Sequence, residues 1–151
     1  MFKAIKQRYY QKAITAALAQ RDVSGLNTKL QTLAILYDGD HVNELSPYYK
    51  IASSLRVLET KTQFFSYVTL KKKTPSLLRD QFSQKDISFK GFIKGASALD
   101  FVAQSPDVLL YMSNKKHLSL ETIVVKSNAK FKVGFKGVDP RYFDLILGVD
   151  P

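Results

Sequence analysis

The chain has two histidines, His41 and His117, and each closes a polar segment that follows a short apolar run. The first segment is Asp38-Gly39-Asp40-His41, and the second is Ser113-Asn114-Lys115-Lys116-His117. Carboxylates and imidazoles ligate zinc and exchange protons near neutral pH, so both segments are candidates for a metal or acid–base site. However, no His-Glu-x-x-His spacing fixes two ligands on one helix face, and Asp-Gly-Asp is also ordinary turn and helix-cap chemistry. We therefore assign no catalytic residue, metal or cofactor here.

The second segment also has the composition of an anion site. Lys115 and Lys116 precede a helix that is expected to begin near Leu118, and its free backbone N–H groups could join them in holding a phosphate or carboxylate. The alternative is that both lysines are solvated loop residues. No dinucleotide fingerprint or P-loop occurs, and two carboxylates beside Gly39 would repel a pyrophosphate. The candidate ligand-binding residues are Asp38, Asp40, His41, Asn114, Lys115, Lys116 and His117.

Positive charge is concentrated in three parts of the chain. The 23 Lys and Arg residues against 13 Asp and Glu give a formal charge of +10. Residues 1–30, 71–95 and 114–136 each carry a net +5, and the second part includes Lys71, Lys72 and Lys73. Such segregation is typical of surfaces for nucleic acid or anionic lipid, and a basic amphipathic first helix could lie on a membrane. A merely solvated surface is the alternative, since no nucleic-acid motif is present.

Alternating strands and helices are expected to position these segments. The pattern predicts helices over 2–20, 41–58, 76–82, 96–104 and 118–126, and strands over 32–37, 62–70, 86–89, 107–112, 131–135 and 143–147. This alternation indicates an α/β fold with a doubly wound, mostly parallel sheet in three layers. The expected strand order is 3-2-1-4-5, with a sixth strand at the edge. Tyr37 and Met112 then end neighbouring strands, and ligands of such sheets bind beyond the carboxyl ends where the order reverses.

Length and composition indicate one globular domain. The 151 residues are 45% hydrophobic and 24% charged, and we expect a single α/β domain with a basic helix in 1–25 and a doubly wound core in 31–151. The lack of cysteine excludes disulfides and thiolate sites. No apolar run is long enough for a transmembrane segment, and the basic start has no signal-peptide core, so a cytoplasmic location is expected. In the pairs Tyr9-Tyr10 and Tyr48-Tyr49, one ring should be buried and the other partly exposed.

Three stretches together resemble a family of small bacterial α/β proteins known only as a domain of unknown function. They are the segment from His117 to Phe135, the preceding Asp107-Val108-Leu109-Leu110, and Phe143-Asp144-Leu145-Ile146-Leu147. The resemblance covers nearly the whole chain, implies a bacterial, cytoplasmic protein, and supplies no activity.

A more distant likeness is to the amino-terminal domain of heptosyltransferase-type glycosyltransferases. It is carried by Ala129-Lys130 and Gly134-Phe135. The glycine-containing loop of those enzymes is replaced here by Asp38-Gly39-Asp40-His41, and 151 residues leave no room for their second domain. A shared scaffold does not imply shared chemistry.

The sequence therefore favours a non-catalytic domain that binds a protein partner or a small anionic ligand. Two alternatives stay open. One is an enzyme acting on a phosphorylated or anionic small molecule in the crevice between the two loops, with Asp38 or His41 as base and Lys116 holding the anion. The other is an RNA-associated protein that uses Lys71, Lys72, Lys73 and the first helix.

Overall fold

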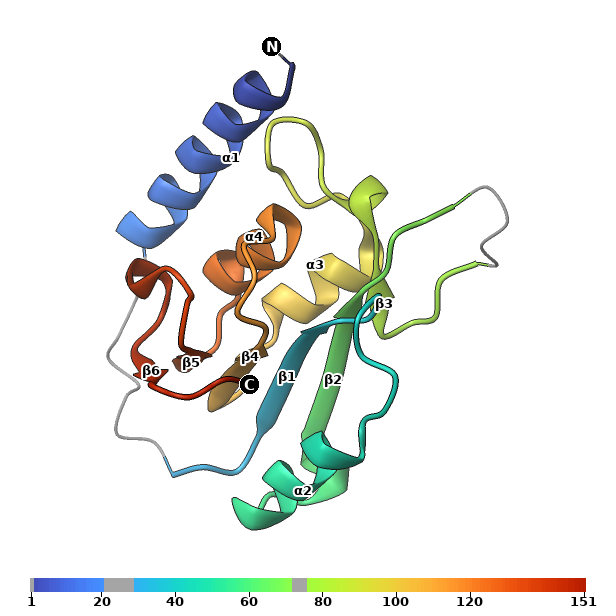
Figure 1. Cartoon of the computed structure of the whole chain (residues 1–151), viewed down its shortest axis with the longest axis vertical. Helices are drawn as coiled ribbons and strands as arrows, with labels where there is room; N and C mark the ends of the chain where they lie inside the picture. The colour runs from blue at the N-terminus through green and yellow to red at the C-terminus, as the bar shows by residue number, and fades with distance from the viewer. Residues whose placement is uncertain (1, 21–28, 72–75) are drawn as a thin grey trace.

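A parallel sheet forms the centre of the molecule. A computed structural model describes residues 2–20, 29–71 and 76–151, and in this part of the chain six strands follow the order β3-β2-β1-β4-β5-β6, all parallel (Figure 1). The strands are β1 (Leu33–Asp38), β2 (Thr62–Tyr67), β3 (Gln81–Phe82), β4 (Val108–Met112), β5 (Phe131–Phe135) and β6 (Leu145–Leu147). The predicted α/β class and strand order are confirmed.

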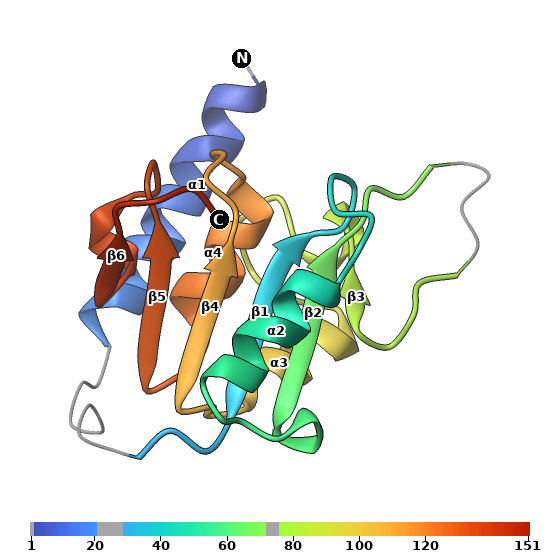
Figure 2. The same cartoon turned by 60° about the horizontal axis from the view of Figure 1, so that its bottom comes forward.

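Helices cover both faces of the sheet, as Figure 2 shows. Helix α2 (Ser46–Ser54) covers one face, and α1 (Phe2–Ala19), α3 (Ala96–Ala103) and α4 (Leu118–Lys126) lie on the other. Strand β1 is buried along its whole length because its side chains pack alternately against the helical layers on the two faces of the sheet. Leu33 and Ile35 pack with the α2 layer, while Ala34 and Leu36 pack with the α1–α3–α4 layer. A continuous apolar run is what a central parallel strand needs.

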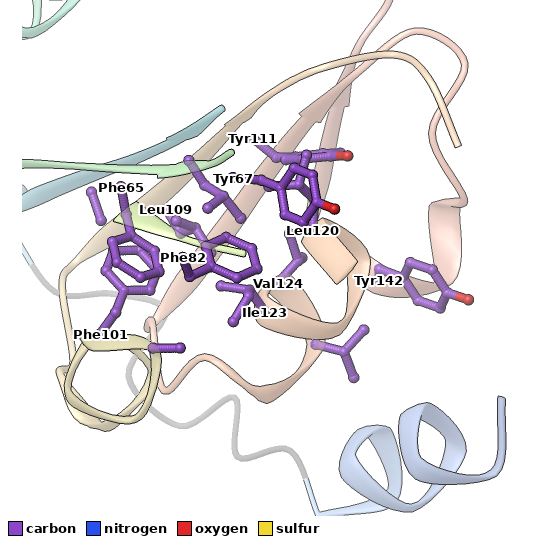
Figure 3. Close-up of a cluster of buried hydrophobic side chains, with 14 of the residues drawn as sticks. Phe65, Tyr67, Phe82, Phe101, Leu109, Tyr111, Leu120, Ile123, Val124 and Tyr142 are labelled. Carbon is purple, nitrogen blue, oxygen red and sulfur yellow. The ribbon is translucent and has the colours of Figure 1, made fainter. Parts of the chain in front are cut away.

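Aromatic rings fill the core between β2, β3 and α3 (Figure 3). The Phe65 ring stacks on Phe82 at 5.2 Å and on Phe101 at 4.4 Å between centroids. Phe65 and Phe82 are almost completely buried, and each such ring contributes roughly 1.5–3 kcal/mol by leaving water. On the same side, α4 is buried along nearly its whole length because α1 packs over it. The first helix is therefore an outer layer, which leaves much of its surface free.

The segment between β2 and α3 differs from the prediction. The predicted helix over 76–82 and the predicted strand over 86–89 are both wrong: β3 is the two-residue strand at Gln81–Phe82, and a 3-10 helix spans Gln84–Asp86. Ser83 and Asp86 form a reciprocal capping box that starts this short helix. Ile87 makes only one antiparallel bridge, to Ile93. A two-residue strand is too short to show an alternating pattern in the sequence. The position of Phe82 in the sheet is therefore set by the packing of its ring against Phe65 and Tyr67.

Other element boundaries change only at their ends. The helix expected over 41–58 is limited to α2, which has Pro47 in its first turn, and β2 ends at Tyr67 rather than at residue 70. Tyr10 is buried while Tyr9 is 40% exposed, as expected for that pair, but in the second pair Tyr48 is only half-buried beside an exposed Tyr49. Residues 21–25, placed with the first helix, and Lys72 and Lys73 lie outside the described residues. Among the helices described, none has the length and apolar character needed to cross a membrane.

Candidate functional site

The two histidine-bearing loops meet at the carboxyl edge of the sheet. β1 and β4 are parallel neighbours, with Tyr37 opposite Met112. Tyr67, at the end of β2, contacts the His117 ring edge-on, with 4.3 Å between ring centroids. The charges of Asp38, Asp40 and His41 all influence the pKa of His117. The predicted convergence of these loops is therefore present in the structure.

The carboxylates of the first loop are engaged by the loop itself. One oxygen of Asp38 lies 2.8 Å from Nδ1 of His41, and the other accepts the Asp40 N–H at 3.1 Å. Asp40 accepts the backbone N–H of Thr69 at 3.1 Å and also the Thr69 hydroxyl. Gly39 lies so close to β2 that a Cβ there would be 2.8 Å from the Tyr67 carbonyl oxygen. These contacts are turn chemistry that fastens the β1–α2 loop to β2.

His117 caps α4. Its Nδ1 accepts the backbone N–H of Leu120 at 3.2 Å, which satisfies one of the free donors in the first helical turn. Burial lowers the pKa of His117, and the opposing effect of Asp38 and Asp40 is smaller. The imidazole is accordingly neutral at pH 7, as the accepting Nδ1 requires. His41 differs, because its side chain is 61% exposed and only Nδ1 is held by Asp38.

The second loop presents its basic side chains to solvent. Asn114, Lys115 and Lys116 are exposed, and the Asn114 amide donates to Asp150 at 3.2 Å. Burial raises the pKa of Glu121 in α4, and the positive charge of Lys116 works against that shift. In the described part of the chain, no group of three or more His, Asp or Glu side chains is placed to hold a metal ion. Ligand binding by the seven candidate residues, and the use of Asp38 or His41 as a base, stay predictions.

A second candidate surface lies on α1 and residues 87–95. The 87–95 loop packs against the helix: the Tyr9 and Phe89 rings lie 5.8 Å apart, and a Cβ on Gly91 would be 3.2 Å from Cβ of Ala13. Gly91 has a φ of +85°, which a residue with a side chain rarely adopts. Figure 1 shows this yellow-green loop beside the amino-terminal half of α1. The close contact explains why a glycine occupies that position.

This surface combines exposed apolar rings with basic groups. Phe2 is 81% exposed, Phe92 60%, Phe89 42%, and Ile5 and Tyr9 40% each. Nζ of Lys90 lies 5.9 Å from the Tyr9 ring centroid, and Nζ of Lys126 lies 5.2 Å from that of Phe92. Neither α1 nor residues 87–95 contains an acidic residue. We call this surface the basic aromatic face and define it by Phe2, Lys3, Ile5, Lys6, Arg8, Tyr9, Lys12, Phe89, Lys90, Phe92, Lys94 and Lys126.

Comparison with known proteins places the chain in a family. The model of the family of unknown function DUF6913 matches residues 6–151. The chain belongs to DUF6913. No curated protein and no solved structure matches it. The resemblance to a domain of unknown function is thereby confirmed, whereas the bacterial origin and the likeness to heptosyltransferase-type enzymes stay predictions.

The surface of this DUF6913 protein differs from the prediction at two places. Lys71 is exposed. Figure 1 shows the described segment 68–71, which follows β2, running away from α1. The sequence does not identify Phe89 and Phe92 as surface residues, because the pattern predicts a strand over 86–89. The alternation Phe89-Lys90-Gly91-Phe92, with a glycine at its centre, was the available signal for an exposed loop.

Proposed function

We propose that this DUF6913 protein is a non-catalytic binding protein whose partner is a negatively charged macromolecular surface. The observation that carries the proposal is the basic aromatic face. It gathers basic side chains from α1, the 87–95 loop and the end of α4 around exposed Phe, Tyr and Ile side chains. Clustered cations raise the local concentration of an anionic partner, and exposed apolar side chains add short-range contact.

Catalysis is less well supported by the same structure. The two carboxylates nearest the histidines are held by Asp40 N–H, His41 and Thr69, so their hydrogen bonds complete a turn. His117 Nδ1 is used by the helix cap. A groove of about 790 Å³ lies away from these two loops, between α1, α3 and α4, and Phe92 and Lys126 line it. Open space is thus found next to the basic aromatic face.

The test compares two sets of charge removals. The face variant is K3Q/R8Q/K90Q/K94Q, and the matched control is K29Q/K50Q/K61Q/K136Q, whose lysines are also exposed but lie outside the face. Both variants lower the formal charge from +10 to +6. Binding is measured to phosphatidylglycerol vesicles, to polyuridine RNA and to polyglutamate, at about 50 and 200 mM salt.

We expect the wild type to bind at least one of these polyanions, and to bind it more weakly at the higher salt concentration. The face variant should lose at least tenfold in affinity, and the control should stay within about threefold of the wild type. Equal losses in both variants would mean that only total charge matters, and the face would then have no special role. Absence of binding to all three probes would also refute the proposal.

A second candidate function is small-anion binding at the carboxyl edge of the sheet. It is favoured by the exposure of Lys115 and Lys116 on the loop that leads into α4, next to the helix N-terminus. Titration with inorganic phosphate, followed by ¹H–¹⁵N NMR, should shift the amide signals of residues 115–119. The K115A/K116A variant should abolish these shifts, and unchanged shifts in that variant would exclude the site.

A further inference from the structure

We infer that the basic aromatic face docks onto an anionic lipid bilayer, with Phe2, Ile5, Phe89 and Phe92 entering the headgroup region. The inference rests on the proposed function and deepens it by naming the partner. It is carried by the position of these apolar side chains on two adjoining segments and by the cations around them.

The apolar side chains of α1 form one stripe that points away from the core. Phe2, Ile5 and Tyr9 are spaced by three and four residues, which places them on one side of a helix. Tyr10 and Ile14 lie on the buried side. Figure 2 shows the amino-terminal half of α1 projecting beyond the carboxyl edge of the sheet. On this stripe Phe2 is largely exposed, while Ile5 and Tyr9 are each 40% exposed.

The 87–95 loop adds large apolar side chains, of which α1 alone has few. Tyr9 packs against Phe89, and Gly91 touches the helix at Tyr10 and Ala13, so the loop is fixed beside the stripe. Phe92, from the same loop, is 60% exposed. Residues about eighty positions apart in the sequence thus contribute to the basic aromatic face, with Phe89 beside Tyr9 and Phe92 beside the carboxyl-terminal half of α1. Large apolar side chains on a basic amphipathic surface are the usual means of interfacial membrane binding.

Basic side chains flank the apolar stripe of α1 on both sides. By helical periodicity, Lys3 and Lys6 lie to one side of the stripe, and Arg8 and Lys12 lie to the other. The loop adds the exposed Lys90 and Lys94. Their aliphatic stems can lie along apolar surface while the ammonium groups reach lipid phosphates. Each basic residue held near an anionic leaflet strengthens binding about fivefold, and neither segment carries an acidic residue to oppose it.

The same contacts argue against single-stranded RNA as the partner. Base stacking needs free ring faces. The Tyr9 ring has Lys90 over it and Phe89 beside it, and the Phe92 ring has Lys126 over it. Ile5 has no ring to stack. Exposed apolar side chains also need no matching groove to enter a bilayer, whereas an acidic protein would have to supply one.

The decisive experiment places a fluorescent reporter in the basic aromatic face. The chain contains no tryptophan, so F92W introduces a single one, and L58W is the matched control. Leu58 is 69% exposed and precedes β2 at the amino end of the sheet. On addition of phosphatidylcholine–phosphatidylglycerol vesicles, F92W emission should shift to shorter wavelength and be quenched by brominated acyl chains. L58W should show neither effect, and pure phosphatidylcholine vesicles should leave F92W unchanged.

A second pair of variants tests the apolar contribution. I5A/F89A should weaken partitioning to the anionic vesicles at least tenfold, because two apolar side chains no longer leave water. L58A/L78A removes two leucines elsewhere that are even more exposed than Ile5 and Phe89, and it should change partitioning less than twofold. All four replaced side chains are partly or largely exposed, so circular dichroism should show folded proteins.

The outcomes separate this inference from the proposed function. Vesicle binding with no change in F92W emission would overturn insertion, and so would binding to polyuridine or polyglutamate but not to anionic vesicles. In these cases the proposed binding of a polyanion stands while the membrane assignment fails. If no polyanion binds, both fail together.

Discussion

Replacing Asp107 should destabilise the fold more than its peripheral position suggests. Its carboxylate accepts the N–H of Gln31 at 2.8 Å, the N–H of Thr32 at 3.0 Å and Nζ of Lys130 at 3.0 Å. One side chain therefore joins the chain entering β1, the start of β4 and the chain entering β5. It is 8% exposed, so water can replace these hydrogen bonds only in part.

The expected loss in D107A follows from those contacts. Two backbone donors lose a charged acceptor, at about 1.5 kcal/mol each. The pair with Lys130 adds less than about 1 kcal/mol, because the lysine side chain is 36% exposed. The free energy of unfolding should therefore fall by about 3 kcal/mol. D107N keeps one acceptor and the side-chain shape, and it should lose about half as much.

The pH dependence gives an independent check. Burial alone would raise the pKa of Asp107, but the hydrogen bonds from Gln31, Lys130 and Thr32 outweigh it and lower the pKa. The folded state thus binds this proton less readily than the unfolded state does. The stabilisation is complete above the ordinary Asp pKa of about 4 and is lost as the pH falls through the lower folded-state pKa. The gap in stability between wild type and D107N should be constant from about pH 7 to 5 and should narrow below about pH 4.

Urea unfolding followed by far-ultraviolet circular dichroism measures these free energies. The matched control is D100A, since Asp100 is exposed on α3 and alanine favours a helix, so its stability should change by less than about 0.5 kcal/mol. If D107A unfolds within about 1 kcal/mol of D100A, the reasoning from these contacts is refuted. If the difference in unfolding free energy between wild type and D107N widens at low pH, the lowered pKa of Asp107 in the folded state is contradicted.

Three further predictions use the same unfolding assay. G39A should lose about 1–3 kcal/mol because its Cβ would collide with the Tyr67 carbonyl oxygen, whereas G148A, with nothing within 4 Å, should change stability by less than about 0.5 kcal/mol; equal effects would contradict the close approach. F82A should lose about 3–5 kcal/mol, since the ring is fully buried, and a loss below about 1.5 kcal/mol would show that β3 contributes little. Because burial lowers the pKa of His117, the wild type should become less stable as the pH falls below about 6.5, and H117N, which keeps a capping oxygen, should lack this slope between about pH 7 and 5; parallel curves would exclude His117 as the cause.

The sequence was sufficient wherever a segment carried its own pattern. The segments that form β1 and β4 are buried on both sheet faces, so each is a short continuous apolar run that can be recognised without knowing its neighbours. The expected strand order 3-2-1-4-5 places Tyr37 beside Met112 and brings the loops of His41 and His117 together, and the structure confirms that order. What these loops bind did not follow, because a carboxylate that closes a turn and one that holds a ligand look the same in sequence.

What only the tertiary structure decided is which side chains share a surface. Composition established an excess of positive charge, and spacing established a basic helix with one buried tyrosine, because charge and periodicity are properties of a continuous segment. The contact of Tyr9 with Phe89 joins segments about eighty residues apart, and the burial of Phe82 depends on the rings of a neighbouring strand. Exposure is set by the packing of distant segments, so the basic aromatic face exists only in the folded chain.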